Sequence, residues 1–216
     1  MLLDVTNPVA DWLFPRRCLL CRKDMAQGLI CCSCFSLCNP CPSVIPVKGQ
    51  TAALFYFEFS IKDIIRQAKF KREPTAVYLL CELIKTELAR TTLISDLQAF
   101  DPLVVTFVPS HVVNRVMRGV ELSYLFAHLV AGRLNRPVVP MLVRRRFFHR
   151  QVLKERKHER RHLISGSYAL RSNMVKYERV LLLDDVVTTG ATLDAAKLEL
   201  REYCKDIVSL AIAKTP

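Results

Sequence analysis

Residues 179–193 read RVLLLDDVVTTGATL, and this stretch decides the predicted fold. Positions 180–183 form an apolar run long enough for a strand that is buried on both faces of a sheet. Asp184 and Asp185 follow the run, then a polar loop with one glycine, and then a helical pattern over 193–203. This order of strand, loop and helix places a helix N-terminus beside a ligand at the carboxyl end of a parallel sheet.

The residue types in this loop predict a site for a sugar phosphate. Backbone N–H groups at a helix start have no intrahelical partner, and the helix dipole adds partial positive charge, so a phosphate monoester is favoured there. Thr188, Thr189 and Thr192 add hydroxyl donors, and Gly190 lets the backbone approach the phosphate closely. Adjacent acids do not bind phosphate, but they accept hydrogen bonds from the vicinal hydroxyls of a ribose. The alternative is an ordinary strand-to-helix turn whose acids cap the helix.

The stretch resembles the phosphoribosyl-pyrophosphate (PRPP) motif of type I phosphoribosyltransferases, which consists of an apolar strand, two acids and a TTGAT-like loop. The agreement runs over about a dozen consecutive residues, so it is more specific than a lone glycine motif. The resemblance implies that Asp184 and Asp185 are the catalytic pair and contact the ribose hydroxyls, directly or through Mg²⁺. It also implies a 5-phosphate site formed by Val187, Thr188, Thr189, Gly190, Ala191 and Thr192.

The remaining patterns predict an α/β domain. Strands are predicted over 52–59, 103–108, 138–143, 167–170 and 207–213, and helices over 61–70, 75–90 and 121–134. Because strands and helices alternate, we expect a mostly parallel sheet flanked by helices. The loop after the strand at 103–108 contains Arg115 and Arg118, which we predict to bind a pyrophosphate by bidentate hydrogen bonds.

The cysteines predict a small metal-binding module at the N-terminus. Of the nine cysteines, seven lie between positions 18 and 41, in C-x-x-C pairs that are typical of a zinc site in a cytosolic chain. The most economical ligand set, which gives a closed structural Zn²⁺ site, is Cys18, Cys21, Cys31 and Cys34. Cys38 and Cys41 could replace the second pair, Cys32 is expected to face away from the metal, and disulfides are the alternative. Prolines at 40, 42 and 46 mark the end of this module, which gives domains at 1–46 and 47–216.

The chain has a large positive charge, concentrated in one segment. The formal net charge is +12, which favours nucleic acids or phosphorylated small molecules as partners. The segment 144–162 has a net charge of +7 from nine cations and two glutamates, and Phe147 and Phe148 could stack on unpaired bases. The alternative is a solvated loop and helix. We predict nucleic-acid contacts at Arg144, Arg145, Arg146, Arg150, Lys154, Arg156, Lys157, Arg160 and Arg161. For Lys69 and Lys71, at the end of the helix predicted over 61–70, a role in binding nucleic acid or pyrophosphate and a merely solvated helix end remain open.

No apolar run reaches the roughly 18 residues that a membrane span needs. The N-terminus lacks the early positive charge of a signal peptide. We therefore expect a cytoplasmic protein that does not insert into membranes.

Taken together, the cysteine module, the PRPP-type motif and the basic segment resemble the ComF (or GntX-like) family of competence-associated, phosphoribosyltransferase-like proteins. The resemblance also includes FPRRCLLC at 14–21, AKFKR at 68–72, the pair Arg118-Gly119, and Gln151 ahead of a basic run. It implies a role in natural transformation, in which the protein handles incoming single-stranded DNA in the cytoplasm.

Three functions follow from these observations. The favoured one is a DNA-processing accessory protein whose basic surface binds single-stranded DNA and whose pocket binds a phosphoribosyl ligand. The second is an active phosphoribosyltransferase with an unidentified acceptor. The third is a non-enzymatic zinc-ribbon adaptor for a competence helicase or another DNA-processing protein.

Overall fold

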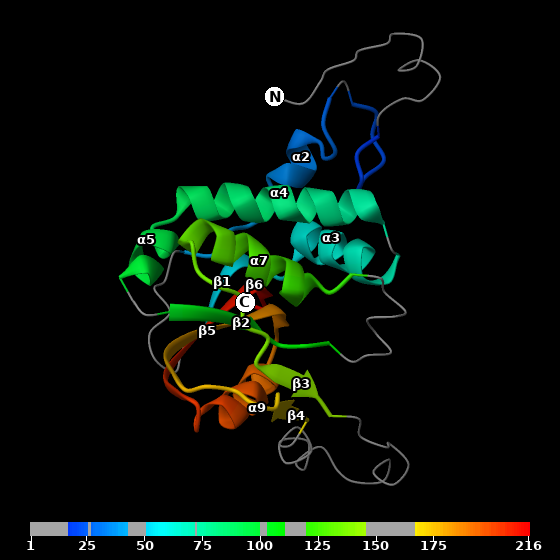
Figure 1. Cartoon of the computed structure of the whole chain (residues 1–216). Helices are drawn as coiled ribbons and strands as arrows, with labels where there is room; N and C mark the ends of the chain where they lie inside the picture. Colours follow the sequence, from blue (N-terminus) through cyan, green and yellow to red (C-terminus); the bar gives the residue numbers. More distant parts are fainter. Residues whose placement is uncertain are drawn as a thin grey trace, which may run out of the picture.

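Four parallel strands form the central sheet, in the order β1-β6-β5-β2 (Figure 1). The computed structural model describes residues 17–25, 27–42, 51–71, 73–99, 103–110, 120–145 and 167–216. The strands of the sheet are β1 (Thr51–Tyr56), β2 (Leu103–Phe107), β5 (Tyr177–Val187) and β6 (Cys204–Lys214). Two short strands, β3 (Leu142–Arg144) and β4 (Tyr168–Leu170), form a separate antiparallel pair.

The apolar run at 180–183 lies at the centre of this sheet and is fully buried. Successive side chains of a strand point to opposite faces, so Leu181 and Leu183 join one hydrophobic core while Val180 and Leu182 join a second. The first core is covered by α3, α4, α5 and α7, and the second by α9 together with β3 and β4 (Figure 1). Helices on both faces of a parallel sheet confirm the predicted α/β class.

Four of the described helices lie close to their predicted positions, and two short ones, at 32–35 and 93–98, were not predicted from the sequence. Their bounds are α2 (Cys32–Phe35), α3 (Phe59–Phe70), α4 (Pro74–Arg90), α5 (Leu93–Gln98), α7 (Leu122–Leu134) and α9 (Ala191–Leu200). The apolar face of α3 consists of Ile61, Ile64, Ile65 and Ala68, all of which are buried. Pro74 occupies the first turn of α4, where its missing N–H breaks no hydrogen bond.

Two predicted elements differ from the structure. The strand predicted over 138–143 is reduced to an isolated bridge between Val138 and Val105 and the short β3, which pairs with β4 outside the main sheet. β5 does not end before the acids: it continues through Asp184 and Asp185 to Val187, because β6 is equally long and pairs with it as far as Lys214.

The end of the cysteine module is joined to the sheet. The Cys41 N–H donates to the Leu54 carbonyl at 2.8 Å, and the Tyr56 N–H donates to the Asn39 carbonyl at 3.0 Å. Pro40 forms an antiparallel bridge with Phe55, so residues 39–41 extend the sheet beside β1. The predicted boundary at position 46 lies outside the described residues and stays a prediction.

Within the described ranges, no helix is both long enough and apolar enough to span a membrane.

Candidate functional site

Asp184 and Asp185 lie near the carboxyl end of β5, at the edge of the sheet where the strand leads into α9. Because they are neighbours in a strand, their side chains point to opposite faces of the sheet. Asp185 lies on the face that α3 covers, where it contacts Lys69. Asp184 lies toward the face that carries α9, β3 and β4. Asp184 and Asp185 are therefore approached by side chains from both faces of the sheet.

Asp185 forms an ion pair with Lys69 in the last turn of α3. The distance from Lys69 Nζ to Asp185 Oδ2 is 2.7 Å. The two side chains are 15% and 22% exposed, so water screens this pair less than it screens a surface ion pair. Lys69 is thus a partner of the acid pair, whereas its predicted role at a nucleic-acid surface requires an accessible ammonium group.

Asp184 is buried, with 7% of its surface exposed. Its Oδ1 accepts a hydrogen bond from the Asp185 backbone N–H at 2.8 Å. Burial, and then the charge of Asp185, raise the pKa of Asp184 to about 8, although the Asp185 amide, Lys69 and Arg144 act in the opposite direction. Burial beside a second carboxyl group therefore favours the protonated form of Asp184 in the free protein.

Two residues of β3 and β4 complete this side of the site. The guanidinium carbon of Arg144 lies 5.7 Å from the centre of the Tyr168 ring, at a distance that suits a cation–π contact. Burial raises the pKa of Tyr168 to about 12, and the charges of Asp184 and Asp185 contribute in the same direction. Position 168 reads only as part of an edge strand in the sequence, so no local pattern marks Tyr168 as a site residue.

The loop that follows β5 presents backbone amides to solvent. Gly190 has a φ of 78°, in the left-handed region that favours glycine, and its carbonyl accepts the first hydrogen bond of α9 from the Asp194 N–H at 2.9 Å. Thr215 fixes the loop by donating from its N–H to the Val187 carbonyl and from its hydroxyl to the Thr188 carbonyl. Among the described residues, no hydrogen-bond acceptor contacts the amides of Thr188, Thr189 or Gly190.

The predicted phosphate residues therefore lie together beside the acids. The side chains of Thr188, Thr189 and Thr192 are exposed, and Val187 is the last residue of β5 rather than part of the loop. The Ala191 N–H lies 3.5 Å from Thr189 Oγ1, which is at the limit of a hydrogen bond and leaves this amide open to a stronger acceptor.

Most of the predicted cationic residues fall outside the part of the chain that the structure describes. This holds for Arg115 and Arg118, and for Arg146, Arg150, Lys154, Arg156, Lys157, Arg160 and Arg161. Arg144, Arg145 and Lys71 are described and exposed. Since β3 carries Arg144, the basic segment begins beside the acid pair.

Four cysteines form the second candidate site. The sulfur atoms of Cys18, Cys21, Cys31 and Cys34 all lie within 4.8 Å of one another. A tetrahedral metal with Zn–S bonds of about 2.3 Å holds its sulfurs about 3.8 Å apart, so this group fits a zinc ion. The prediction that these four cysteines come together is confirmed. Cys32 is exposed and lies outside the group, also as predicted.

Hydrogen bonds favour the thiolate of Cys18, whereas burial and the neighbouring thiols raise the pKa of Cys34 to about 12. The Cys31 N–H lies 3.4 Å from Cys18 Sγ and donates to it. Burial acts to raise the pKa of Cys18, but backbone amides of Cys21, Cys31 and Leu20 together outweigh it and lower that pKa to about 6. Cys38 and Cys41, the alternative pair, lie outside the four-cysteine group, and burial raises the pKa of each to about 11.

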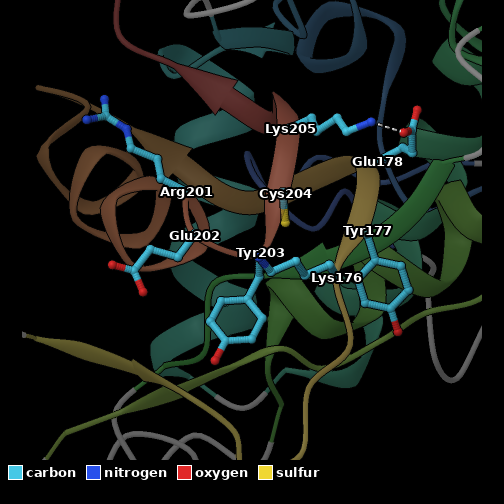
Figure 2. A pocket seen from close by; sticks show the side chains of 8 residues that line it. All are labelled: Lys176, Tyr177, Glu178, Arg201, Glu202, Tyr203, Cys204 and Lys205. Carbon is cyan, nitrogen blue, oxygen red and sulfur yellow. Dashed lines mark hydrogen bonds and ion pairs between the residues drawn. The ribbon is translucent and has the colours of Figure 1, made fainter.

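A hollow of about 470 Å³ lies at the opposite edge of the sheet, where β5 and β6 begin (Figure 2). Lys205 and Glu178 form an ion pair across its rim (Figure 2). Three cations and two glutamates line it, so the charges almost balance. No predicted site residue lies there, and the candidate site remains at the carboxyl edge.

We expect the purified protein to contain about one zinc per chain, because four thiolates satisfy the tetrahedral coordination of the ion. Cys21→Ser should lose most of the zinc and unfold at lower temperature, because metal binding contributes folding energy to so small a module. The matched control is Cys32→Ser, which should keep its zinc. Metal content by atomic emission and thermal unfolding check this, and loss of zinc from both variants would contradict the ligand set.

The raised pKa of Asp184 predicts a stability that depends on pH. Its carboxyl group keeps its proton in the folded chain up to about pH 8 but loses it near the ordinary value of 3.8 in the unfolded chain. Folding therefore takes up a proton, and the free energy of unfolding should fall as pH rises through this window, at up to about 1.4 kcal/mol per pH unit. Urea unfolding at a series of pH values should show a flatter profile for Asp184→Asn, whereas Asp63→Asn, an exposed change on α3, should keep the wild-type slope.

Comparisons with known proteins give likenesses of structure only. No protein-family model matches the chain, and no curated protein matches it. One match is the allosteric regulatory enzyme of purine biosynthesis, at 20% identity and a TM-score of 0.38, over 55% of this chain and 23% of that enzyme. Adenine phosphoribosyltransferase from Leishmania tarentolae matches at 13% identity and a TM-score of 0.37, over 67% of this chain and 73% of its own. A hypoxanthine phosphoribosyltransferase from Staphylococcus aureus matches at 15% identity and a TM-score of 0.37, over 64% and 74% of the two chains.

Proposed function

We propose that this chain is a type I phosphoribosyltransferase-like protein that binds a ribose 5-phosphate ligand, such as PRPP, at the carboxyl edge of its sheet. The observation that carries the proposal is the juxtaposition of two unlike groups. The open amides of Thr188, Thr189 and Gly190 suit a phosphate, and they lie at the end of the strand that contains Asp184 and Asp185. An anion site directly beside hydrogen-bond acceptors is what a sugar phosphate requires.

Each group has a separate task in this proposal. The loop amides and the hydroxyls of Thr188, Thr189 and Thr192 bind the 5-phosphate, aided by the dipole of α9. Asp185 accepts a hydrogen bond from one ribose hydroxyl. Asp184, protonated for much of the time near neutral pH, both donates to and accepts from the other.

Carboxylate oxygens are ligands that Mg²⁺ accepts, but Asp185 already pairs with Lys69, so the Mg²⁺ that accompanies PRPP is not assigned to the acids. Such an ion would neutralise charge on the pyrophosphate. If the chain turns PRPP over, Arg115 and Arg118 are the proposed partners of the pyrophosphate, and the residues act by positioning and charge stabilisation. The acceptor in that reaction is unassigned.

We further propose that the basic segment beginning at Arg144 binds single-stranded DNA, as expected of a cytoplasmic competence protein. The supporting observation is that Arg144, the last residue of β3, and Arg145, which follows it, are exposed at the start of the segment whose charge is +7. A strand bound there would run beside the phosphoribosyl pocket. Docking of a competence helicase on the cysteine module is compatible with this arrangement.

Titration calorimetry with ribose 5-phosphate and with PRPP plus Mg²⁺ tests the pocket. The wild type should release or take up heat on binding. The double change Asp184→Asn and Asp185→Asn should weaken binding at least about tenfold, because losing the charged hydrogen bond of Asp185 costs roughly 1.5–3 kcal/mol. The control Asp63→Asn should bind as the wild type does. A wild type that binds neither ligand would refute the pocket.

Fluorescence anisotropy with a labelled oligo(dT) strand across a salt series tests the DNA proposal. The affinity should fall with salt, and Arg144→Gln plus Arg145→Gln should lower the salt slope by about 0.7 for each phosphate contact that is lost. Arg133→Gln, an exposed change on α7, should leave the slope unchanged. An affinity that does not depend on salt would argue against phosphate contacts.

A further inference from the structure

The last turn of α3 brings a cation to the acid pair from outside the motif that contains the acids. Lys69 Nζ lies 2.7 Å from Asp185 Oδ2, and only 15% of the Lys69 side chain is exposed to solvent. Helix α3 is fixed by its buried apolar face, so the position of Lys69 is set by packing rather than by the loop.

Cations approach the acid pair from both faces of the sheet. Burial is the main cause that raises the pKa of Asp184, while Lys69 and Arg144 both act to lower it, which places both cations within electrostatic range of the acids. Two carboxyl groups therefore face two cations, one on each side of the sheet. The carboxylate oxygen of Asp185 that Lys69 contacts is also the type of ligand that Mg²⁺ binds.

We propose that Lys69 is a positioning residue that takes the place of a divalent cation at the acid pair, so that ribose 5-phosphate binds without Mg²⁺. This inference rests on the proposed function, because it concerns how the same pocket binds its ligand. The ammonium group neutralises Asp185 and keeps its other oxygen oriented toward the ribose. It also offsets the charge that the incoming phosphate adds beside the acids.

The geometry indicates that Lys69 and Mg²⁺ would exclude one another at Asp185 instead of binding there together. Mg²⁺ binds carboxylate oxygens at about 2.1 Å and requires near-octahedral coordination. An ion bound to Asp185 Oδ2 would displace the ammonium group that contacts this oxygen now. A metal and Lys69 thus compete for one position, and the lysine belongs to the chain itself.

The experiment is calorimetry with ribose 5-phosphate, which lacks a pyrophosphate that would bring its own metal, in EDTA and in excess Mg²⁺. Wild-type affinity should agree within about twofold between the two conditions. Lys69→Met should weaken binding about tenfold in EDTA, and Mg²⁺ should restore most of that loss. Lys69→Arg keeps the positive charge and should retain binding in EDTA.

Lys62→Met is the matched control, because it makes the same change two turns earlier on the same helix and should leave both affinities unchanged. Near-ultraviolet circular dichroism establishes that each variant is folded. The proposal is overturned if the wild type binds only with Mg²⁺, or if Lys69→Met and Lys62→Met bind equally well in EDTA. A wild type that binds in neither condition would instead refute the pocket itself, so the two failures are distinguishable.

Discussion

Two adjacent carboxyl groups near the end of a buried strand are the constraint on which the site depends. A pair of charges in consecutive residues at the edge of an apolar core is unfavourable, because burial disfavours the ionised form and the charges repel one another. The structure relieves this in three ways. The pleat directs the side chains to opposite faces, the Asp185 amide donates to Asp184, and Lys69 pairs with Asp185. Two layers of the fold therefore have to assemble before the acids can lie where they do.

The length of β5 determines where the two acids and the loop after them lie. Aspartate is disfavoured in strands, yet β5 continues through both acids because β6 pairs with it residue by residue as far as Lys214. The extended pairing carries the loop at 188–190 beyond the hydrophobic cores. There its amides meet solvent instead of being satisfied inside the sheet.

Local patterns in the sequence predicted the α/β class, most helix and strand positions, and the cysteine cluster. The run at 180–183 and the apolar face of α3 are periodic signals that need no knowledge of distant residues. The pairing of Lys69 with Asp185 and the place of Tyr168 depend on residues that are far apart in the sequence, and no local pattern contains them. No local pattern decides whether Cys31 and Cys34 or Cys38 and Cys41 complete the metal site. The choice is decided by the pairing of residues 39–41 with β1, which places the second pair in the interior.

The chemistry of the pocket separates the two ligands that we propose for this chain. A site whose two acids each contact one hydroxyl of a diol disfavours a deoxyribose, since the missing 2′-hydroxyl would leave one buried acid without its partner. A DNA strand is therefore a poor ligand for the pocket, although its phosphates would suit the loop at 188–190. In our proposal the strand binds instead to the basic segment, which begins at Arg144. Its guanidinium group contacts Tyr168 and influences Asp184 on one side, and it starts the basic segment on the other. Occupation of the pocket and binding of a strand would then act on the same residue from opposite directions, which is the simplest physical route by which one could affect the other.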